Sequence, residues 1–350
     1  MEKRMNNFGK RRANNETYLI AELSANHGNS LETAIETIRA AAASGADAIK
    51  VQTYTADTIT LDCDNEYFQI KHETIWDGTT LHKLYEEASM PWEWHAPLQK
   101  VANELGMDFF STPFDFTAVD LLENLNVPVY KIASLEINDI PLLELVASKK
   151  KPILISTGIA SLADIEEAVN TCRKAGNNDI VLLKCTSSYP APYEEANLLT
   201  IPNLAATFGV TAGLSDHTMG HVVPLGAVAL GAKVIEKHFI LNRDVPSADA
   251  SFSMLPDEFK LMAESIRILE KALGKITYEL SDKTKKSKDF SRSLFIVKNV
   301  KAGETFTHEN LKSIRPGYGM HTRNLKNLIG KVASKDILRG TPMKEDFVKN

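Results

Sequence analysis

Two histidines stand at the ends of two neighbouring strand-like runs, each with an acidic residue nearby. The phrase GLSDH ends on His217 beside Asp216, and EKHF places Glu236 two residues before His238. Two neutral imidazoles can hold a divalent cation and leave most of its coordination positions to water and substrate, as a catalytic metal requires. Nitrogen and oxygen ligands suit a borderline ion such as manganese, with zinc, iron or cobalt as alternatives. Spacing alone leaves buried core histidines equally open.

A second set of residues could hold an anion, because it combines two lysines with several hydroxyl groups. The set consists of Lys50, Thr112, Lys131, Ser134, Ser156, Ser187 and Ser215. Two unit charges 4 Å apart interact by about 4 kcal/mol at an effective dielectric constant of 20. Two lysines could therefore hold a phosphate or a phosphorylated carboxylate, although the chain's net charge is −5. The alternative is that one lysine pairs with Glu22 or Glu236 instead.

These residues follow short apolar runs that alternate with amphipathic stretches. The runs are residues 18–23, 47–52, 107–112, 127–132, 151–156, 179–185, 211–215 and 232–237. Near-continuous apolar strands joined by helices are typical of a parallel sheet covered on both faces. Eight strand-then-helix units, ending with a helix over about 256–273, predict an α/β fold of the (β/α)8 TIM barrel type. An open doubly wound sheet is the alternative, but no glycine-rich dinucleotide motif follows the first strand.

The barrel prediction explains why the chemical residues stand at strand ends. Active sites of such barrels lie at the carboxyl ends of the strands. Each candidate taken alone has an ordinary structural explanation, such as a cap or a satisfied core histidine. Convergence of all eight strand ends on one rim is harder to explain by burial alone.

We expect four segments along the chain. A disordered or extended tail covers residues 1–17, the barrel 18–274, a polar, lysine-rich linker 275–290, and a small module 291–350. Within the module, 299–311 and 336–348 share an aliphatic residue, a glycine, an apolar residue and an acid at three-residue intervals. This half-repeat predicts a pseudo-symmetric, mostly β unit.

Composition narrows the class of protein. The negative net charge argues against nucleic acid as the main partner. The three cysteines, Cys63, Cys172 and Cys185, form no CxxC pair, which suits a reducing compartment. The basic, polar start is no secretory signal, and no apolar run could span a bilayer, so we expect a cytoplasmic protein without membrane contact.

A set of motifs, in order along nearly the whole chain, resembles the sialic acid synthase family. The motifs are AELSANH (21–27), KVQTYTADT (50–58), STPFD (111–115), YKIAS (130–134), STG (156–158), YPAPYE (189–194), GLSDHT (213–218), EKHF (236–239) and RPG (315–317). The C-terminal module is similar to the antifreeze-like (SAF) domain. LSANH, QTYTADTITLD, IWDGTTLHKLYEEA and PWEWH are most similar to the branch that forms pseudaminic acid.

The resemblance implies condensation of phosphoenolpyruvate with an open-chain N-acetylated amino sugar, giving a nine-carbon 2-keto acid and phosphate. By position, His217 and His238 match the family's manganese ligands, with magnesium or cobalt as alternatives. The seven residues of the anion-binding set match phosphoenolpyruvate positions. Glu22, Tyr189 and Asp249 match sugar-contacting positions, with Glu22 as the acid–base group.

Two further points come from the resemblance. Arg315 matches an arginine that reaches a neighbouring subunit's active site, which implies a domain-swapped homodimer. Ser187 stands where the neuraminate branch carries an asparagine, and the loop after Tyr54 also differs from that branch. An N-acetylneuraminate or legionaminate synthase is the alternative within the family.

Substrate choice should depend on residues 54–95. Tyr54, Phe68 and Trp76 could line a pocket for a 6-deoxy sugar with two acetamido groups, or they could cover the side of the barrel. Two other classes of protein stay open. One is a Schiff-base aldolase with Lys50 or Lys131 as the nucleophile. The other is a carbohydrate-binding protein that functions through its C-terminal module.

Overall fold

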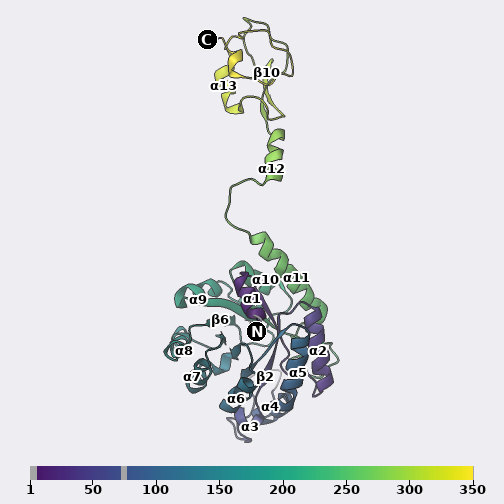
Figure 1. Ribbon diagram of the computed structural model, residues 1–350, viewed down its shortest axis with the longest axis vertical. Coiled ribbons are helices and arrows are strands. Elements are labelled where there is room, and N and C mark those ends of the chain that lie inside the picture. The colour runs from purple at the N-terminus through teal and green to yellow at the C-terminus, as the bar shows by residue number, and fades with distance from the viewer. Residues whose placement is uncertain (1–5, 72–76, 350) are drawn as a thin grey trace, which may run out of the picture. The chain divides into compact units, whose positions relative to one another are not determined.

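The computed structural model describes residues 6–71 and 77–349, and the chain divides into two compact units, Met1–Gly274 and Lys275–Asn350 (Figure 1). In the first unit, eight parallel strands close into a barrel in sequence order. The strands are β1 (Tyr18–Glu22), β2 (Ala48–Thr53), β3 (Asp108–Pro113), β4 (Tyr130–Ile132), β5 (Ile153–Ser156), β6 (Ile180–Cys185), β7 (Thr211–Asp216) and β8 (Val234–His238). The predicted (β/α)8 barrel is confirmed, and an open doubly wound sheet is excluded.

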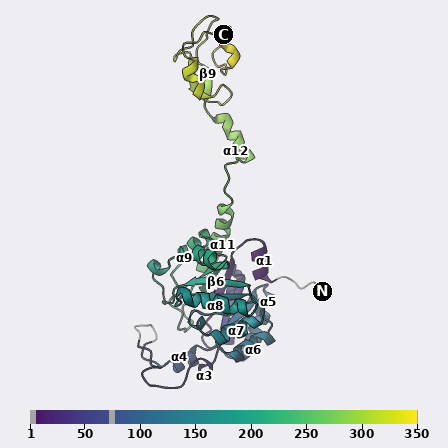
Figure 2. The same cartoon turned by 90° about the vertical axis from the view of Figure 1, so that its left-hand side faces the viewer.

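Helices form a ring around the barrel, as Figures 1 and 2 show. They are α2 (Leu31–Ala43), α5 (His95–Glu104), α6 (Phe116–Asn124), α7 (Ile140–Ser148), α8 (Leu162–Lys174), α9 (Thr200–Phe208), α10 (Val222–Ala229) and α11 (Pro256–Leu273). Their starts follow local chemistry: Ser161 caps α8 in a capping box with Asp164, as its spacing predicts. The strands are almost wholly buried because helices cover their outer sides and neighbouring strands their edges.

The connection between β2 and α5 carries two additional helices, α3 (Ala56–Ile59) and α4 (Leu81–Ala88). Gln69 and Thr80 form an isolated antiparallel bridge just before α4. Trp76, expected near the sugar, lies outside the described residues. This excursion leaves the carboxyl end of β2, so its position is that of an active-site loop.

The N-terminal segment differs from the expected disordered or extended tail, because it contains helix α1 (Asn7–Ala13). Asn6 caps the helix, and Phe8 is buried with its ring centroid 5.2 Å from that of Tyr18. The sequence did not predict this helix because Phe8 is its one buried residue and lies in an otherwise polar stretch.

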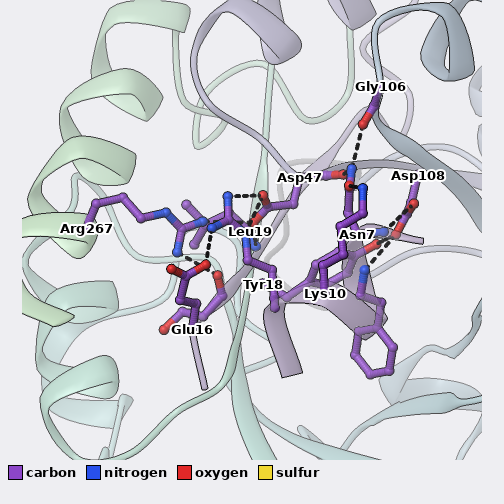
Figure 3. A network of polar contacts seen from close by, with 12 residues as sticks. Asn7, Lys10, Glu16, Tyr18, Leu19, Asp47, Gly106, Asp108 and Arg267 are labelled. Atoms are coloured by element: carbon purple, nitrogen blue, oxygen red, sulfur yellow. Dashed lines mark hydrogen bonds and ion pairs between the residues drawn. The ribbon is translucent and has the colours of Figure 1, made fainter. Parts of the chain in front are cut away.

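Polar contacts hold α1 at the end of the barrel where the strands begin (Figure 3). Asp108 accepts hydrogen bonds from the backbone N of Asn7 at 3.0 Å and from Tyr18 Oη at 2.9 Å. Asp47 pairs with Arg11 at 2.7 Å and with Arg267 of α11 at 2.9 Å. The amino-terminal end of the barrel is therefore closed by structural contacts, and the opposite end is left for function.

The second unit has its own apolar core and a two-stranded antiparallel sheet, β9 (Ser293–Ile296) with β10 (Leu311–Ile314). Helices α12 (Asp282–Ser287) and α13 (Leu325–Leu328) belong to this unit. The predicted half-repeat is visible, because Val300 and Ile337 bridge each other through hydrogen bonds of 2.9 and 2.7 Å. Gly303 and Gly340 then take matching positive φ angles of 86° and 88°, which glycine adopts without strain.

Candidate active site

Strand register brings Glu22 between two other candidate residues. In the parallel ladder Glu22 is paired with Lys50 on β2 and with His238 on β8. Glu22 and His238 are the last residues of β1 and β8, and Lys50 lies level with them within β2, three residues before its end at Thr53. Functional groups of a parallel barrel gather toward the carboxyl ends of its strands.

A buried charge cluster forms around Lys50. Its Nζ lies 2.5 Å from Glu22 Oε2, 4.0 Å from Glu236 Oε2 and 3.3 Å from Thr112 Oγ1. Burial alone would lower the pKa of Lys50, but the two carboxylates raise it above its ordinary value. The pairing of Lys50 with Glu22, one of the two alternatives read from the sequence, is therefore present.

Glu22 is almost fully buried, with an exposed fraction of 1%. Burial raises the pKa of Glu22, Lys50 opposes this effect, and the neighbouring Glu236 adds to it. Gln52 Nε2 donates a hydrogen bond to Glu22 Oε1 at 3.2 Å and another to Ser24 Oγ at 2.9 Å. A carboxyl group held in this way, with its pKa moved toward neutrality, is suited to proton transfer.

Lys131 forms the centre of the hydroxyl-rich side. Its Nζ donates hydrogen bonds to Ser156 Oγ and to the carbonyl of Ile132, both at 2.7 Å. Burial lowers the pKa of Lys131. In the part of the chain that the structure describes, no carboxylate lies within ion-pair distance of this ammonium group. A buried ammonium group in this setting is suited to binding an anion.

Gly158 explains how the hydroxyl groups converge beside Lys131. A Cβ at this position would meet Ser134 Oγ at 2.7 Å and Cys185 Sγ at 3.2 Å, and would lie closer still to Ser187 Oγ. The backbone N of Ile159 donates a hydrogen bond of 3.0 Å to Ser134 Oγ. The absence of a side chain at 158 thus lets three side chains from β4, β6 and their loops share one space.

Glu236 completes the charge cluster; the sequence analysis considered it as an acidic neighbour of His238 and as an alternative partner of a lysine, without giving it a role in the site. It accepts a hydrogen bond of 2.9 Å from Ser215 Oγ. Burial raises the pKa of Glu236, but Lys50 and Lys131 lower it by a larger amount. The pKa of Glu236 is therefore below its ordinary value. Its spacing could have identified it, because residues two apart on a strand share a face and His238 follows two residues later.

The two histidines come together as predicted, with ring centroids 5.2 Å apart. His217 Nδ1 donates a hydrogen bond of 2.9 Å to the carbonyl of Thr186. Burial and His238 lower the pKa of His217 to about 3, so its ring is neutral and its Nε2 lone pair is available. A carbonyl partner on one ring nitrogen is the usual support for a metal ligand on the other.

His238 Nδ1 lies 3.5 Å from Asp249 Oδ2, and that buried nitrogen makes no hydrogen bond within the described part of the chain. The ring of Tyr189 packs against the ring of His217, with their centroids 4.4 Å apart. Among the residues described, no group of three or more His, Cys, Asp or Glu side chains could hold a metal. His217 and His238 alone would offer an ion two nitrogen donors, which would leave its remaining positions to water and substrate.

Outside the histidines, a buried ion pair connects the same two strands. Asp216 and Lys237, one residue before each histidine, are register partners, and Lys237 Nζ lies 2.9 Å from Asp216 Oδ2. Successive strand residues point to opposite sides, so this pair lies behind the histidine pair. Asp216 also accepts hydrogen bonds of 3.0 Å from Thr218 N and Oγ1.

A cavity of about 350 Å³ opens beside the histidines. Its lining includes His238, Asp249, Gln52 and Tyr189 together with Tyr54. Phe68, expected in the same pocket, is not among the described lining residues, and Tyr67 lines the cavity instead. Glu136, two residues after Ser134, also borders the cavity and was not anticipated.

The predicted site residues of the first unit gather at the carboxyl ends of the strands. These are Glu22, Lys50, Thr112, Lys131, Ser134, Ser156, Ser187, Tyr189, Ser215, His217, His238 and Asp249. Arg315 belongs to the second unit, where it is exposed and directly follows β10. No described helix is both long and apolar enough to cross a membrane.

Comparisons with known proteins agree with this arrangement. The model of the NeuB family matches residues 37–278, and the SAF domain matches residues 291–349. The chain is 45% identical to pseudaminic acid synthase of Helicobacter pylori, over 95% of this chain and 97% of that protein. It is 36% identical to N,N'-diacetyllegionaminic acid synthase of Legionella pneumophila, over 97% of each chain. The crystal structure of spore coat polysaccharide biosynthesis protein SpsE of Bacillus subtilis superposes with a TM-score of 0.64 at 35% identity, over 96% of each chain.

Proposed function

The chain belongs to the NeuB family, and from this premise we propose that it is an enzyme that makes pseudaminic acid. It would condense phosphoenolpyruvate with 2,4-diacetamido-2,4,6-trideoxy-altrose and release phosphate. One observation supports this most strongly: Glu22 is in register with Lys50 on one side and His238 on the other. The register places three proposed groups side by side on the adjacent strands β8, β1 and β2. They are a metal ligand, the acid–base group and a cation for phosphoenolpyruvate.

Phosphoenolpyruvate would occupy the hydroxyl-rich side. Lys131 offers an ammonium group without a carboxylate partner among the described residues, and Ser156 already accepts its hydrogen bond at 2.7 Å. Ser134 and Ser187 lie in the space that Gly158 leaves open. Lys50, Thr112 and Ser215 would complete the contacts from β2, β3 and β7.

A divalent cation would be held by His217 and His238, with manganese as our proposal and magnesium or cobalt as alternatives. When bound, such a cation supplies Lewis-acid polarisation of a carbonyl oxygen. The neutral state of His217 and its hydrogen bond to Thr186 prepare the ring for this task. Tyr189 and Asp249 would contact the sugar next to the pair.

The reaction would join C3 of phosphoenolpyruvate to the aldehyde carbon of the sugar. The sugar oxygen takes up a proton, and water adds to C2 of the former enol ester. Loss of a proton and cleavage of the C2–O bond to phosphate then leave the 2-keto acid. Glu22, oriented by Gln52, would move protons in these steps, which contributes about a hundred- to ten-thousand-fold in rate. Holding the two reactants in the correct relative orientation would lower the activation free energy by about 7 to 11 kcal/mol.

A homodimer in which the partner subunit's C-terminal unit covers the barrel mouth would bring Arg315 to the site. Large apolar side chains are exposed on the segments that follow β4, β6 and β7, namely Leu135 (63%), Leu199 (76%) and Val222 (71%) at the start of α10. Apolar groups exposed around one opening favour a protein partner there. The cytoplasm is the compartment we propose, since the three cysteines are all free thiols.

Phosphate release from phosphoenolpyruvate, measured across a panel of amino sugars with and without a chelator, tests the proposal. We expect release with the diacetamido trideoxy sugar and its loss on chelation. The similarity to the Legionella enzyme favours legionaminate synthesis as the second candidate, and faster release with N-acetylmannosamine would indicate N-acetylneuraminate instead. The lowered pKa of Lys131 suits a Schiff-base nucleophile, so a borohydride-trapped adduct and indifference to chelator would indicate an aldolase.

A further inference from the structure

The cavity beside the histidines has two chemically different ends. Polar groups of Gln52, His238 and Asp249 line the end at the strand termini. The part of the lining that comes from the excursion between β2 and α5 is mainly aliphatic and aromatic, with Ile70, Leu81 and Leu84 as aliphatic members and Gln69 as a polar one. A ligand that fills the cavity must therefore be polar at one end and apolar at the other.

Helix α4 supplies most of the apolar end. Leu81, Leu84, Tyr85 and Ala88 all line the cavity and follow the spacing i, i+3, i+4 and i+7, which places them on one helix face. None of the residues of α4 is fully buried. The apolar face therefore borders open space, where a helix packed on a core would have buried it.

Aromatic packing holds this face in place. Tyr54 is only 4% exposed, and its ring meets Tyr85 edge-on with centroids 5.7 Å apart. On its other side Tyr54 meets Phe114 of the β3–α6 loop, at 5.1 Å. Trp92 Nε1 donates a hydrogen bond of 3.1 Å to the carbonyl of Tyr54. These contacts anchor the apolar face of α4 to the barrel, so the shape of this part of the cavity is preformed.

We propose that Leu81 and Leu84 form a selectivity wall that receives the terminal methyl group of a 6-deoxy sugar and disfavours a 6-hydroxyl group. This inference rests on the proposed function, which places the sugar's aldehyde carbon at the histidine end. The opposite end of the sugar chain then extends toward α4. A hydroxyl group placed against Leu81 and Leu84 would leave water without gaining a hydrogen-bond partner from either side chain, whereas a methyl group would gain apolar contact.

The test compares two sugars that differ in one oxygen atom: 2,4-diacetamido-2,4,6-trideoxy-altrose and its 6-hydroxy counterpart. We expect kcat/KM, followed by phosphate release, to favour the deoxy sugar by about 10- to 200-fold. A Leu84→Asn variant should reduce this ratio by at least about 10-fold, mainly by weakening turnover of the deoxy sugar. Leu84→Met, which keeps the wall apolar, should retain the ratio.

Lys83→Gln is the matched control, because Lys83 is exposed on the same helix and does not line the cavity. A wild-type ratio near one would overturn the inference without any variant, and so would an unchanged ratio in Leu84→Asn. Both results leave the proposed function standing, because both require phosphate release. Absence of release with every sugar would instead contradict the proposed function itself.

Discussion

Glu22 is the residue on which most of the proposed chemistry depends, and its contacts determine which substitution is informative. Its Oε2 atom lies 2.5 Å from Lys50 Nζ, so alanine would leave this buried ammonium group without a hydrogen-bond acceptor at position 22. Glu22→Gln keeps the shape and the hydrogen-bonding side chain but cannot carry the proton. We expect kcat to fall by about a hundred- to ten-thousand-fold, measured as phosphate release.

Phosphoenolpyruvate binding should survive this change, because the lysine and serine side chains that would hold it are untouched. Calorimetric titration with phosphoenolpyruvate measures this separately from turnover. Glu32→Gln, on an exposed position of α2, serves as the control for loss of a carboxylate. Equal losses of binding and turnover would remove Glu22 from the acid–base role.

Glu136 gives a prediction about stability and pH. Burial raises the pKa of Glu136 from 4.5 to about 7, with Lys131 opposing, and its Oε2 atom has no hydrogen-bond partner in the described part of the chain. A raised folded-state pKa means that the native protein binds the proton more tightly than the unfolded chain. The stability from this group is therefore fully present below pH 4.5 and is lost as pH rises toward 7.

Glu136→Gln should remove that pH dependence. Relative to the wild type, the variant should gain roughly 3 kcal/mol of stability above pH 7, from 1.36 kcal/mol per pKa unit, and gain little near pH 4. Denaturant unfolding at both pH values measures the difference. A gain that is the same at pH 4 and pH 8 would show that Glu136 does not titrate in this range.

At the scale of elements, β7 and β8 must hold His217 and His238 in a fixed relation. The ion pair of Asp216 with Lys237 crosses the same two strands one residue earlier, and both side chains are buried. Lys237→Met leaves a buried carboxylate without its cation, which should cost about 3–5 kcal/mol of unfolding free energy. If the ion pair of Asp216 and Lys237 aligns the two histidines, Lys237→Met should also lower the affinity for manganese, which calorimetry measures.

The double variant Asp216→Asn with Lys237→Met separates charge from alignment. Asparagine Oδ1 can still accept the hydrogen bond from Thr218 N, and its Nδ2 can donate one to Thr218 Oγ1, which then accepts where it donated before. Removing both charges should recover most of the stability lost in Lys237→Met. If manganese affinity is unaffected in the single and the double variant, the ion pair does not position the histidines.

The elements were readable from the sequence because their signals are local. Apolar runs predicted the strands, and a capping box at Ser161 marked the start of a helix that the structure confirms. The end of β7 then located His217, and Lys50 was found because it lies near the end of the predicted run 47–52. Helix α1 escaped because only Phe8 of its residues is buried, and its polar anchors, Asp47 and Asp108, lie far along the chain.

The contacts inside the site were less predictable for a related reason. Which carboxylate would pair with Lys50 depends on the register between β1, β2 and β8, and a one-residue shift would have turned these side chains away. The selectivity wall depends on where a long connection folds back, and Leu84 carries no mark in the sequence of facing a cavity. Position along a strand could be read, whereas distance across the barrel could not.

At the scale of the whole molecule, the proposed homodimer predicts that one active site takes residues from two chains. Arg315→Ala would then damage the partner's site, whereas Glu22→Gln damages the site of its own chain. When the two variants are co-expressed, half of the dimers formed at random contain one chain of each kind. Each mixed dimer has one site with both Glu22 and Arg315 intact, so about a quarter of wild-type turnover per chain should return.

If Arg315 instead serves its own barrel, no site in the mixture is complete and turnover stays at the level of the separate variants. Light scattering of the purified mixture establishes that dimers are present, and phosphate release with phosphoenolpyruvate and the diacetamido sugar measures the recovery.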